Sequence, residues 1–224
     1  MVKAVLFDLD ETLFDRSRTL PVFLSDQFTR FEAHLGTVER GDWCARFLEL
    51  DANGRTHKSI VYPELLSTFG GDPEAAPALL DDYYDHSTAK PFAIPGMSTV
   101  LSDLRRSGLL CGLITNGETR LQSRTISALG LTDRMDVILI SEAEGVRKPD
   151  PVIFRRTVER LGVLPNEALY IGDNPEADVW GAANAGLHGV WFNPNGRAWP
   201  QHLNPPTETV MTRLTDILAL LKIN

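Results

Sequence analysis

Residues 5–15 read Val5-Leu6-Phe7-Asp8-Leu9-Asp10-Glu11-Thr12-Leu13-Phe14-Asp15, and they begin as a buried strand that ends in two carboxylates. The preceding run from Met1 is almost continuously apolar, which is typical of a strand covered on both faces. Side chains alternate along a strand, so Asp8 and Asp10 can point the same way where it ends. Their repulsion costs about 4 kcal/mol at ~4 Å near a protein surface. The pair indicates either an ordinary acidic turn or a site that holds positive charge.

The composition limits the classes of function that need to be considered. The chain has 224 residues, 43% of them apolar and 23% charged, which predicts one large domain or one domain with an insertion. Its formal net charge of −8 offers no basic field, so binding to nucleic acid or to an anionic membrane is not expected. The two cysteines, Cys44 and Cys111, lie far apart in the sequence, and no apolar run reaches the ~18 residues of a membrane span. With no signal-peptide pattern, we expect a reduced, cytoplasmic protein.

The segment 16–90 is predicted to be entirely helical. Apolar side chains recur there at helical spacing in four groups, which include Phe23, Trp43, Tyr62 and Leu79. An all-helical insert that follows a single strand indicates a separate small domain.

From Pro91 onward the pattern changes to alternating strands and helices. Strands are expected at 109–114, 137–140, 168–171 and 189–192, helices at 97–107, 118–129, 151–161, 177–185 and 212–222, and a loop at 193–206. Strands and helices that alternate with short links predict a parallel sheet covered by helices on both faces. The sequence therefore predicts an α/β core interrupted by a helical insert.

Polar residues that follow the predicted strands form the candidate site, because function gathers at the carboxyl ends of parallel strands. They are Asp8, Asp10, Thr115, Asn116, Lys148, Asp173 and Asp178. Four aspartates against one lysine would repel a phosphate unless a divalent cation joined them. Oxygen ligands without His or Cys favour Mg²⁺. Asp173 and Asp178 are five residues apart and can converge only if the intervening turn folds back.

With a cation present, this set of groups is suited to phosphoryl transfer. One carboxylate can attack phosphorus and form an aspartyl-phosphate. A second carboxyl group can protonate the leaving oxygen and later activate water. A hydroxyl group and a lysine can hold the oxygens over which charge spreads.

The same residues resemble the four motifs of the haloacid dehalogenase (HAD) superfamily, and the resemblance extends over nearly the whole chain. The motifs are Asp8-Leu9-Asp10-Glu11-Thr12-Leu13, Leu113-Ile114-Thr115-Asn116-Gly117, Lys148-Pro149 and Gly172-Asp173-Asn174-Pro175-Glu176-Ala177-Asp178. The resemblance implies a Rossmann-like parallel-sheet core, residues 1–15 and 91–224, and an inserted, mobile helical cap domain, residues 16–90.

The resemblance also implies a role for each aspartate. Asp8 would be the nucleophile that becomes phosphorylated. Asp10 would be the general acid and base, and its backbone carbonyl would bind Mg²⁺. Asp173 would be a ligand of Mg²⁺, and Asp178 would support the ion directly or through water. The metal site implied by the resemblance therefore comprises Asp8, Asp10, Asp173 and Asp178.

Three further residues would contact the substrate in a protein that resembles this family. Thr115 would hold a phosphoryl oxygen together with the backbone N–H groups of Leu9 and Asn116. Lys148 would stabilise both the nucleophile and the phosphoryl group. Catalysis would then depend on Asp8, Asp10, Thr115 and Lys148.

Asp10 favours a phosphatase over a 2-haloacid dehalogenase, because dehalogenases similar to this chain lack the second acid. Residues 113–178 are most similar to the 5′-nucleotidase-like phosphatases of the superfamily. The expected substrate is a small phosphorylated metabolite, with a nucleoside monophosphate as one candidate, and the expected assembly is a monomer or homodimer. The alternatives are a 2-haloacid dehalogenase and a phospho-accepting signalling receiver, a class about half this length that lacks a cap.

Other residues have competing interpretations. Asn116 could cap the next helix or touch the substrate. Arg147 and the polar loop 53–58 could bind the substrate, although exposed loops are the simpler interpretation. Glu142 is a candidate for positioning Lys148. Trp191, Phe192 and Trp199 are expected to be packing residues.

Overall fold

The computed structural model describes residues 1–205 and 209–223, and the chain divides into two compact units. One unit comprises Met1–Arg16 and Pro91–Asn224, and the other comprises Ser17–Lys90. The final residue of the predicted loop 193–206 lies outside the described residues.

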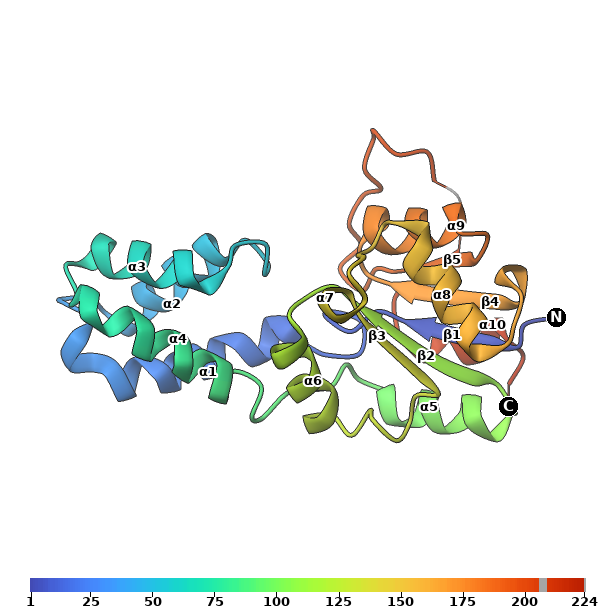
Figure 1. Ribbon diagram of the computed structural model, residues 1–224, viewed down its shortest axis with the longest axis horizontal. Coiled ribbons are helices and arrows are strands. Elements are labelled where there is room, and N and C mark those ends of the chain that lie inside the picture. Colours follow the sequence, from blue (N-terminus) through green and yellow to red (C-terminus); the bar gives the residue numbers. More distant parts are fainter. Residues whose placement is uncertain (206–208, 224) are drawn as a thin grey trace. The chain divides into compact units, whose positions relative to one another are not determined.

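Within the described residues, six parallel strands form one sheet in the order β3-β2-β1-β4-β5-β6, of which Figure 1 labels β1 to β5. The strands are β1 (Ala4–Phe7), β2 (Leu110–Thr115), β3 (Val137–Ile140), β4 (Ala168–Gly172), β5 (His188–Phe192) and β6 (Val210–Met211). The predicted α/β fold with a helical cap inserted after β1 is thereby confirmed. Because β1 pairs with both β2 and β4, the strand order reverses beside it. Such a reversal opens a crevice at the carboxyl ends of the strands.

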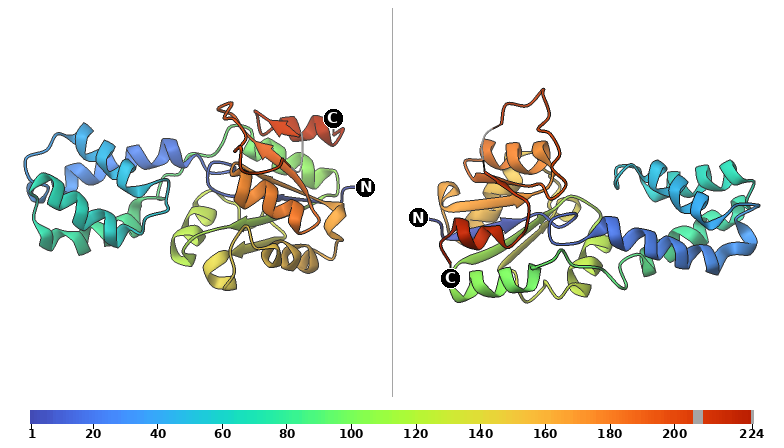
Figure 2. Two further views of the ribbon diagram at one scale, coloured as in Figure 1. Left: turned by 90° about the horizontal axis from the view of Figure 1, so that it is seen from above. Right: turned by 180° about the vertical axis from the view of Figure 1, so that it is seen from behind.

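Helices cover both faces of the sheet (Figures 1 and 2), and the hydrophobic core of this unit lies on both faces. Side chains alternate along β1, so Val5 and Phe7 enter one cluster while Ala4 and Leu6 enter the other. The first cluster includes side chains of α5 (Met97–Arg106), α6 (Thr119–Ala128) and α10 (Asp216–Leu220). The second includes side chains of α8 (Pro151–Leu161) and α9 (Gly181–Asn184). Burial of β1 on both sides explains its continuous apolar sequence.

The structure departs from the predicted elements in four places. The expected helix 177–185 is a π-helical turn, η4 (Pro175–Trp180), followed by the short α9. The expected final helix 212–222 shortens to α10 and is preceded by β6, whose two residues are too few to show a periodic pattern. A short helix, α7 (Ser141–Glu144), follows β3, and a 3₁₀ turn, η3 (Pro165–Glu167), precedes β4.

The inserted unit Ser17–Lys90 is fully described and is helical throughout its regular structure (Figure 2). Its helices are α1 (Arg16–Phe31), α2 (Arg40–Asp51), α3 (Lys58–Phe69) and α4 (Ala76–His86), with 3₁₀ turns η1 (Glu32–His34) and η2 (Pro73–Ala75). Aromatic rings meet at its centre, where the ring centroids of Phe47 and Tyr62 are 5.4 Å apart. Packing of these rings on one another stabilises the bundle beyond the burial of their area.

One residue of the polar loop 53–58 has a structural role inside the bundle. Lys58 is only 7% exposed, and its ammonium group lies 2.5 Å from Asp51 and donates to the carbonyl of Thr56 at 2.9 Å. The neighbouring Asn53 and Arg55 are exposed. Burial of a lysine requires such pairing, so Lys58 stabilises this unit. In the described part of the chain, no helix is long and apolar enough to cross a membrane.

Candidate active site

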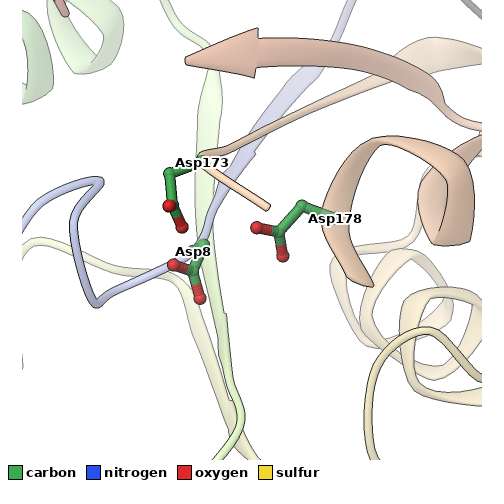
Figure 3. A group of neighbouring side chains, drawn as sticks. All are labelled: Asp8, Asp173 and Asp178. Carbon is green, nitrogen blue, oxygen red and sulfur yellow. The ribbon is translucent and has the colours of Figure 1, made fainter. Parts of the chain in front are cut away.

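Three of the predicted aspartates converge at the carboxyl edge of the sheet (Figure 3). Asp8 follows β1, Asp173 follows β4, and Asp178 lies in η4. One carboxylate oxygen from each lies within 4.8 Å of the others. The crevice beside β1 therefore holds a compact cluster of carboxylate oxygens.

The turn after β4 folds back and brings Asp178 to this cluster. The backbone N–H of Asn174 donates to the Asp178 carboxylate at 2.9 Å, and the Asn174 side chain accepts from the N–H groups of residues 176 and 177 at 3.0 Å. The approach of Asp178 also requires a glycine at position 172, because a Cβ there would collide with the Asp178 carboxylate. One asparagine and one glycine thus allow Asp173 and Asp178, five residues apart, to converge.

Lys148 neutralises part of this cluster. Its Nζ donates to Asp8 Oδ1 at 2.5 Å, to Asp178 Oδ1 at 2.7 Å and to the hydroxyl oxygen of Tyr170 at 2.8 Å. Lys148 is 3% exposed, so all three of its N–H donors have buried partners. The ammonium group is therefore fixed between the two carboxylates that it joins.

The side chain of Asn116 holds the backbone of Lys148. Its Nδ2 donates to the Lys148 carbonyl at 2.9 Å, and its Oδ1 accepts from the Lys148 N–H at 2.9 Å. Glu118, not Asn116, occupies the N-cap position of α6, where Glu142 accepts from the N–H of Thr119 at 2.7 Å. Asn116 therefore does not cap α6, and its side chain holds the backbone of Lys148. Glu142 accepts a hydrogen bond at the start of α6, and the ammonium group of Lys148 has other partners.

Asp10 lies apart from the three clustered carboxylates. Its Oδ2 accepts from Nε2 of Gln122 at 2.9 Å, and the same nitrogen lies 3.0 Å from Oγ1 of Thr115. Thr115 is fully buried at the end of β2. The two aspartates of the opening motif consequently have different surroundings: an ionic cluster around Asp8 and a neutral amide beside Asp10.

Burial and neighbouring charges shift the protonation of the cluster. Burial raises the pKa of Asp8 well above its ordinary value, Lys148 opposes this shift, and Asp178 adds to it. Burial lowers the pKa of Lys148, but the two carboxylates outweigh it and hold that pKa well above its ordinary value. The ammonium group therefore stays charged, and the carboxylates would gain from a second cation.

Asp173 has a cationic partner of its own. Burial and Asp178 raise its pKa to about 6, and Arg197 opposes the rise. Nη2 of Arg197 donates to the Asp173 carboxylate at 3.0 Å and to its backbone carbonyl at 2.7 Å. The indole N–H of Trp191 donates to the same carbonyl at 3.0 Å, and the ring of Trp199 meets Trp191 edge to face at 5.3 Å. The loop after β5 thus orients Asp173.

Gln122, Tyr170 and Arg197 did not appear among the residues selected from the sequence. Tyr170 carries a hydroxyl group into an otherwise apolar strand, and Gln122 stands four residues before the buried Ile126 of α6. A polar group at a core position needs a buried partner, so both were detectable as exceptions to the apolar pattern. Arg197 lies in an irregular loop, where no comparable signal exists.

The donor set suits a hard divalent cation. All three clustered ligand groups are carboxylates, the oxygen donors that Mg²⁺ and Ca²⁺ prefer, and Lys148 alone does not balance them. The residues present therefore fit a divalent metal at the position where Asp8, Asp173 and Asp178 meet.

Comparison with known proteins places this arrangement in a family. The model of haloacid dehalogenase-like hydrolases matches residues 5–192. The chain is 39% identical over 133 residues to phosphoserine phosphatase of Thermus thermophilus, covering 59% of this chain and 53% of that protein. It is 30% identical over 193 residues to glyceraldehyde 3-phosphate phosphatase of Pyrococcus furiosus, covering 85% and 80%. Pyrimidine 5′-nucleotidase YjjG of Escherichia coli is 36% identical over half of each chain.

Solved structures show the same fold. The Bacillus subtilis protein YfnB, solved bound to magnesium, superimposes with a TM-score of 0.80 at 23% identity over 99% of both chains. A 2-haloacid dehalogenase from Pseudomonas syringae superimposes with a TM-score of 0.68 at 27% identity, also over 99% of both chains. The fold therefore does not exclude a dehalogenase, and the distinction has to come from the site.

Proposed function

The chain belongs to the haloacid dehalogenase-like hydrolases and is a phosphatase of that family, and we propose that it uses Mg²⁺ and an aspartyl-phosphate on Asp8 to hydrolyse a small phosphorylated metabolite. The observation that carries this proposal is the separate placement of two neighbouring carboxylates. Asp8 is buried against Lys148, whereas Asp10 is partly exposed and bonded to the neutral Gln122. Two carboxylates in unlike environments are suited to unlike roles.

The first chemical step assigned to this geometry is attack by Asp8 on phosphorus. The ammonium group of Lys148 holds Oδ1 of Asp8, and the hydroxyl of Thr12 lies 3.4 Å from Oδ2. A bond forms between an Asp8 oxygen and phosphorus while the bond from phosphorus to the leaving oxygen breaks. Asp10 donates a proton to that leaving oxygen, which departs as an alcohol. Thr115 holds a phosphoryl oxygen during the transfer, and the charge of Lys148 stabilises the nucleophile and the phosphoryl group.

The second step returns the protein to its starting state. Asp10, now a carboxylate, takes a proton from water, and the water oxygen bonds to phosphorus as the bond between the Asp8 oxygen and phosphorus breaks. Phosphate leaves, and Asp8 and the protonated Asp10 are restored. Carboxylates of Asp8, Asp173 and Asp178 and the backbone carbonyl of Asp10 would hold Mg²⁺. When bound, the ion neutralises charge on the phosphoryl group.

Asp10 also supports a phosphatase over a 2-haloacid dehalogenase. Halide departs without a proton, so a dehalogenase has no use for a second carboxyl group beside the nucleophile. The similarity to the nucleotidase YjjG covers only half of this chain. The phosphoserine and glyceraldehyde 3-phosphate phosphatases match 59% and 85% of it, and they are named for other substrates. We therefore propose the class of small phosphate monoesters, with nucleoside monophosphates as one candidate among them.

We further propose that residues 16–90 form a cap domain, which is inserted into a core domain of residues 1–15 and 91–224. We propose that this unit selects among substrates, so substitution of its exposed residues Asn53 or Arg55 should change the preference among phosphate monoesters more than the rate with p-nitrophenyl phosphate. Variants with an unchanged preference would count against that role.

The proposed reaction is tested by phosphate release from p-nitrophenyl phosphate and from a panel of mononucleotides and sugar phosphates with Mg²⁺. We expect many phosphate molecules per protein, release that stops with a metal chelator, and no turnover in Asp8→Asn. Asp133→Asn, at an exposed position, is the control for loss of an acidic charge. Release of only one p-nitrophenolate per protein, with the phosphoryl group retained on the protein, would instead favour a phospho-accepting receiver. Release of halide from a 2-haloacid, without phosphate release, would favour a dehalogenase.

A further inference from the structure

We propose that Gln122 is a positioning residue that holds Asp10 in the orientation for proton transfer to the leaving oxygen. This inference rests on the proposed phosphatase function, and it concerns a residue outside the four motifs. Gln122 lies in the first turns of α6, where its backbone N–H donates to the carbonyl of Glu118 at 3.0 Å. Its side chain is 6% exposed and reaches across to the carboxylate of Asp10, which lies 112 positions earlier in the chain.

The contacts of the Gln122 amide fix which of its atoms faces Asp10. Nε2 lies 2.9 Å from Asp10 Oδ2, 3.0 Å from Thr115 Oγ1 and 3.2 Å from the backbone carbonyl of Asn116. An ionised carboxylate and a carbonyl can only accept, so the amide nitrogen, not the oxygen, must face them. Gln122 therefore donates to Asp10, and it links the proposed acid to the end of β2.

A glycine in the neighbouring backbone, Gly117, leaves room for the amide group of Gln122. Gly117 has a φ of +156°, and a Cβ there would lie 2.8 Å from Nε2 and 3.0 Å from Cγ of Gln122. Distances below 3.0 Å are almost never found for a Cβ, so any other residue at position 117 would push the amide away. The glycine and the glutamine thus act together to place one N–H donor beside the carboxylate.

This donor has a chemical consequence for the protonated form of Asp10. In a protonated carboxyl group the carbonyl oxygen accepts better than the hydroxyl oxygen, so the hydrogen bond from Nε2 to Oδ2 favours the acidic proton on the other oxygen, Oδ1. The carboxyl group is then held with its proton on one defined side. Orientation of this kind contributes to catalysis because a proton donor acts only within hydrogen-bond reach of its acceptor.

The test compares two substrates that differ in their need for a proton. An alkyl phosphate such as glycerol 2-phosphate releases a poor leaving group that must be protonated, whereas p-nitrophenolate leaves without a proton. The measured quantity is kcat/KM, which covers the steps up to release of the first product. We expect Gln122→Met to lower kcat/KM for the alkyl phosphate at least tenfold more than for p-nitrophenyl phosphate.

Three variants complete the experiment. Gln122→Glu has the same shape but, when ionised, donates no hydrogen bond, so it should reproduce the selective loss if the methionine variant folds poorly. Asp10→Asn sets the full size of the effect, and Gln122→Met should add little to it in the double variant. Thr125→Val, a buried change one turn further along α6, should lower both substrates equally if it lowers either.

An equal loss on both substrates in Gln122→Met and Gln122→Glu would give Gln122 a structural role only and would overturn the inference. An unchanged kcat/KM on both would overturn it as well. A native protein that hydrolyses neither substrate would contradict the proposed phosphatase function itself, so the two failures are distinguishable.

Discussion

Tyr170→Phe removes a single oxygen from the centre of the site and leaves the ring in place. The hydroxyl of Tyr170 donates to the carbonyl of Ile114 at 3.1 Å and accepts from the ammonium group of Lys148 at 2.8 Å. Burial raises the pKa of Tyr170 well above its ordinary value, so the phenol stays protonated at neutral pH and can make both bonds. The ring packs edge to face on Phe154 with centroids 4.9 Å apart, and phenylalanine preserves that contact.

The expected cost follows from the two bonds that are lost. A neutral hydrogen bond contributes about 1 kcal/mol and one to a charged group about 1.5–3 kcal/mol, and both partners of Tyr170 stay buried. We therefore expect Tyr170→Phe to lower the free energy of unfolding by about 2–4 kcal/mol in the absence of metal.

Urea unfolding followed by tryptophan fluorescence measures this change. Trp43 is the tryptophan of the inserted unit, so a Trp43→Phe background confines the signal to the sheet-containing unit. Thr157→Val in that unit is the matched control, because it removes one neutral buried bond to the carbonyl of Ile153 and should cost about 1 kcal/mol or less. A Tyr170→Phe protein within about 0.5 kcal/mol of its background would refute the reasoning that the hydroxyl stabilises Lys148.

Three further predictions concern charge. Arg197→Gln should raise the pKa of Asp173 above its value of about 6, because Arg197 lowers it, and carboxyl NMR titration of metal-free protein measures the change. Protonation of Asp173 below that value competes with Mg²⁺, so calorimetry should find Mg²⁺ binding about tenfold weaker at pH 5 than at pH 7.5, and equal affinities would contradict this. Lys58→Met should destabilise the inserted unit by about 3–5 kcal/mol, because it leaves Asp51 buried without its cation. Unfolding followed by Trp43 fluorescence measures this loss, and an added Asp51→Asn substitution should restore part of the stability.

The fold could be predicted because its central strands are long apolar runs and its connections are short. Strand β3 and helix α8 have the limits expected from the sequence, and β1 shows its burial on both faces through Ala4–Phe7. The end of the chain could not be predicted in the same way. Strand β6 contains two residues, and its pairing with β5 depends on backbone bonds such as Asn193 N–H to the Met211 carbonyl at 2.7 Å. Backbone pairing of so short a segment leaves no pattern in the side chains.

The predicted site residues owe their common location to the geometry of a parallel sheet. Strand ends lie at one edge, so Asp8, Thr115 and Asp173 could be assigned to a shared region without knowledge of any contact. The approach of Asp178 depended on whether the turn after β4 folded back, which the spacing alone could not decide. In the structure the turn does fold back, and the Asn174 N–H donates to the Asp178 carboxylate at 2.9 Å. Lys148 comes from a loop, and the side chain of Asn116 explains how that loop is held.

Residues that orient the site act through side-chain reach between distant elements, which sequence spacing does not encode. Gln122 and Asp10 are 112 positions apart, and Arg197 and Asp173 are 24 apart in different loops. A buried amide or phenol nevertheless needs a partner, since burial without one costs about 1–3 kcal/mol. A glutamine on the apolar side of a helix, or a tyrosine two residues before a motif glycine, is therefore evidence for an undetected acceptor or donor. The need of a buried polar group for a partner points to Gln122 and Tyr170 in the sequence. It does not point to Arg197, because an arginine in an exposed loop has no unpaired buried group to satisfy.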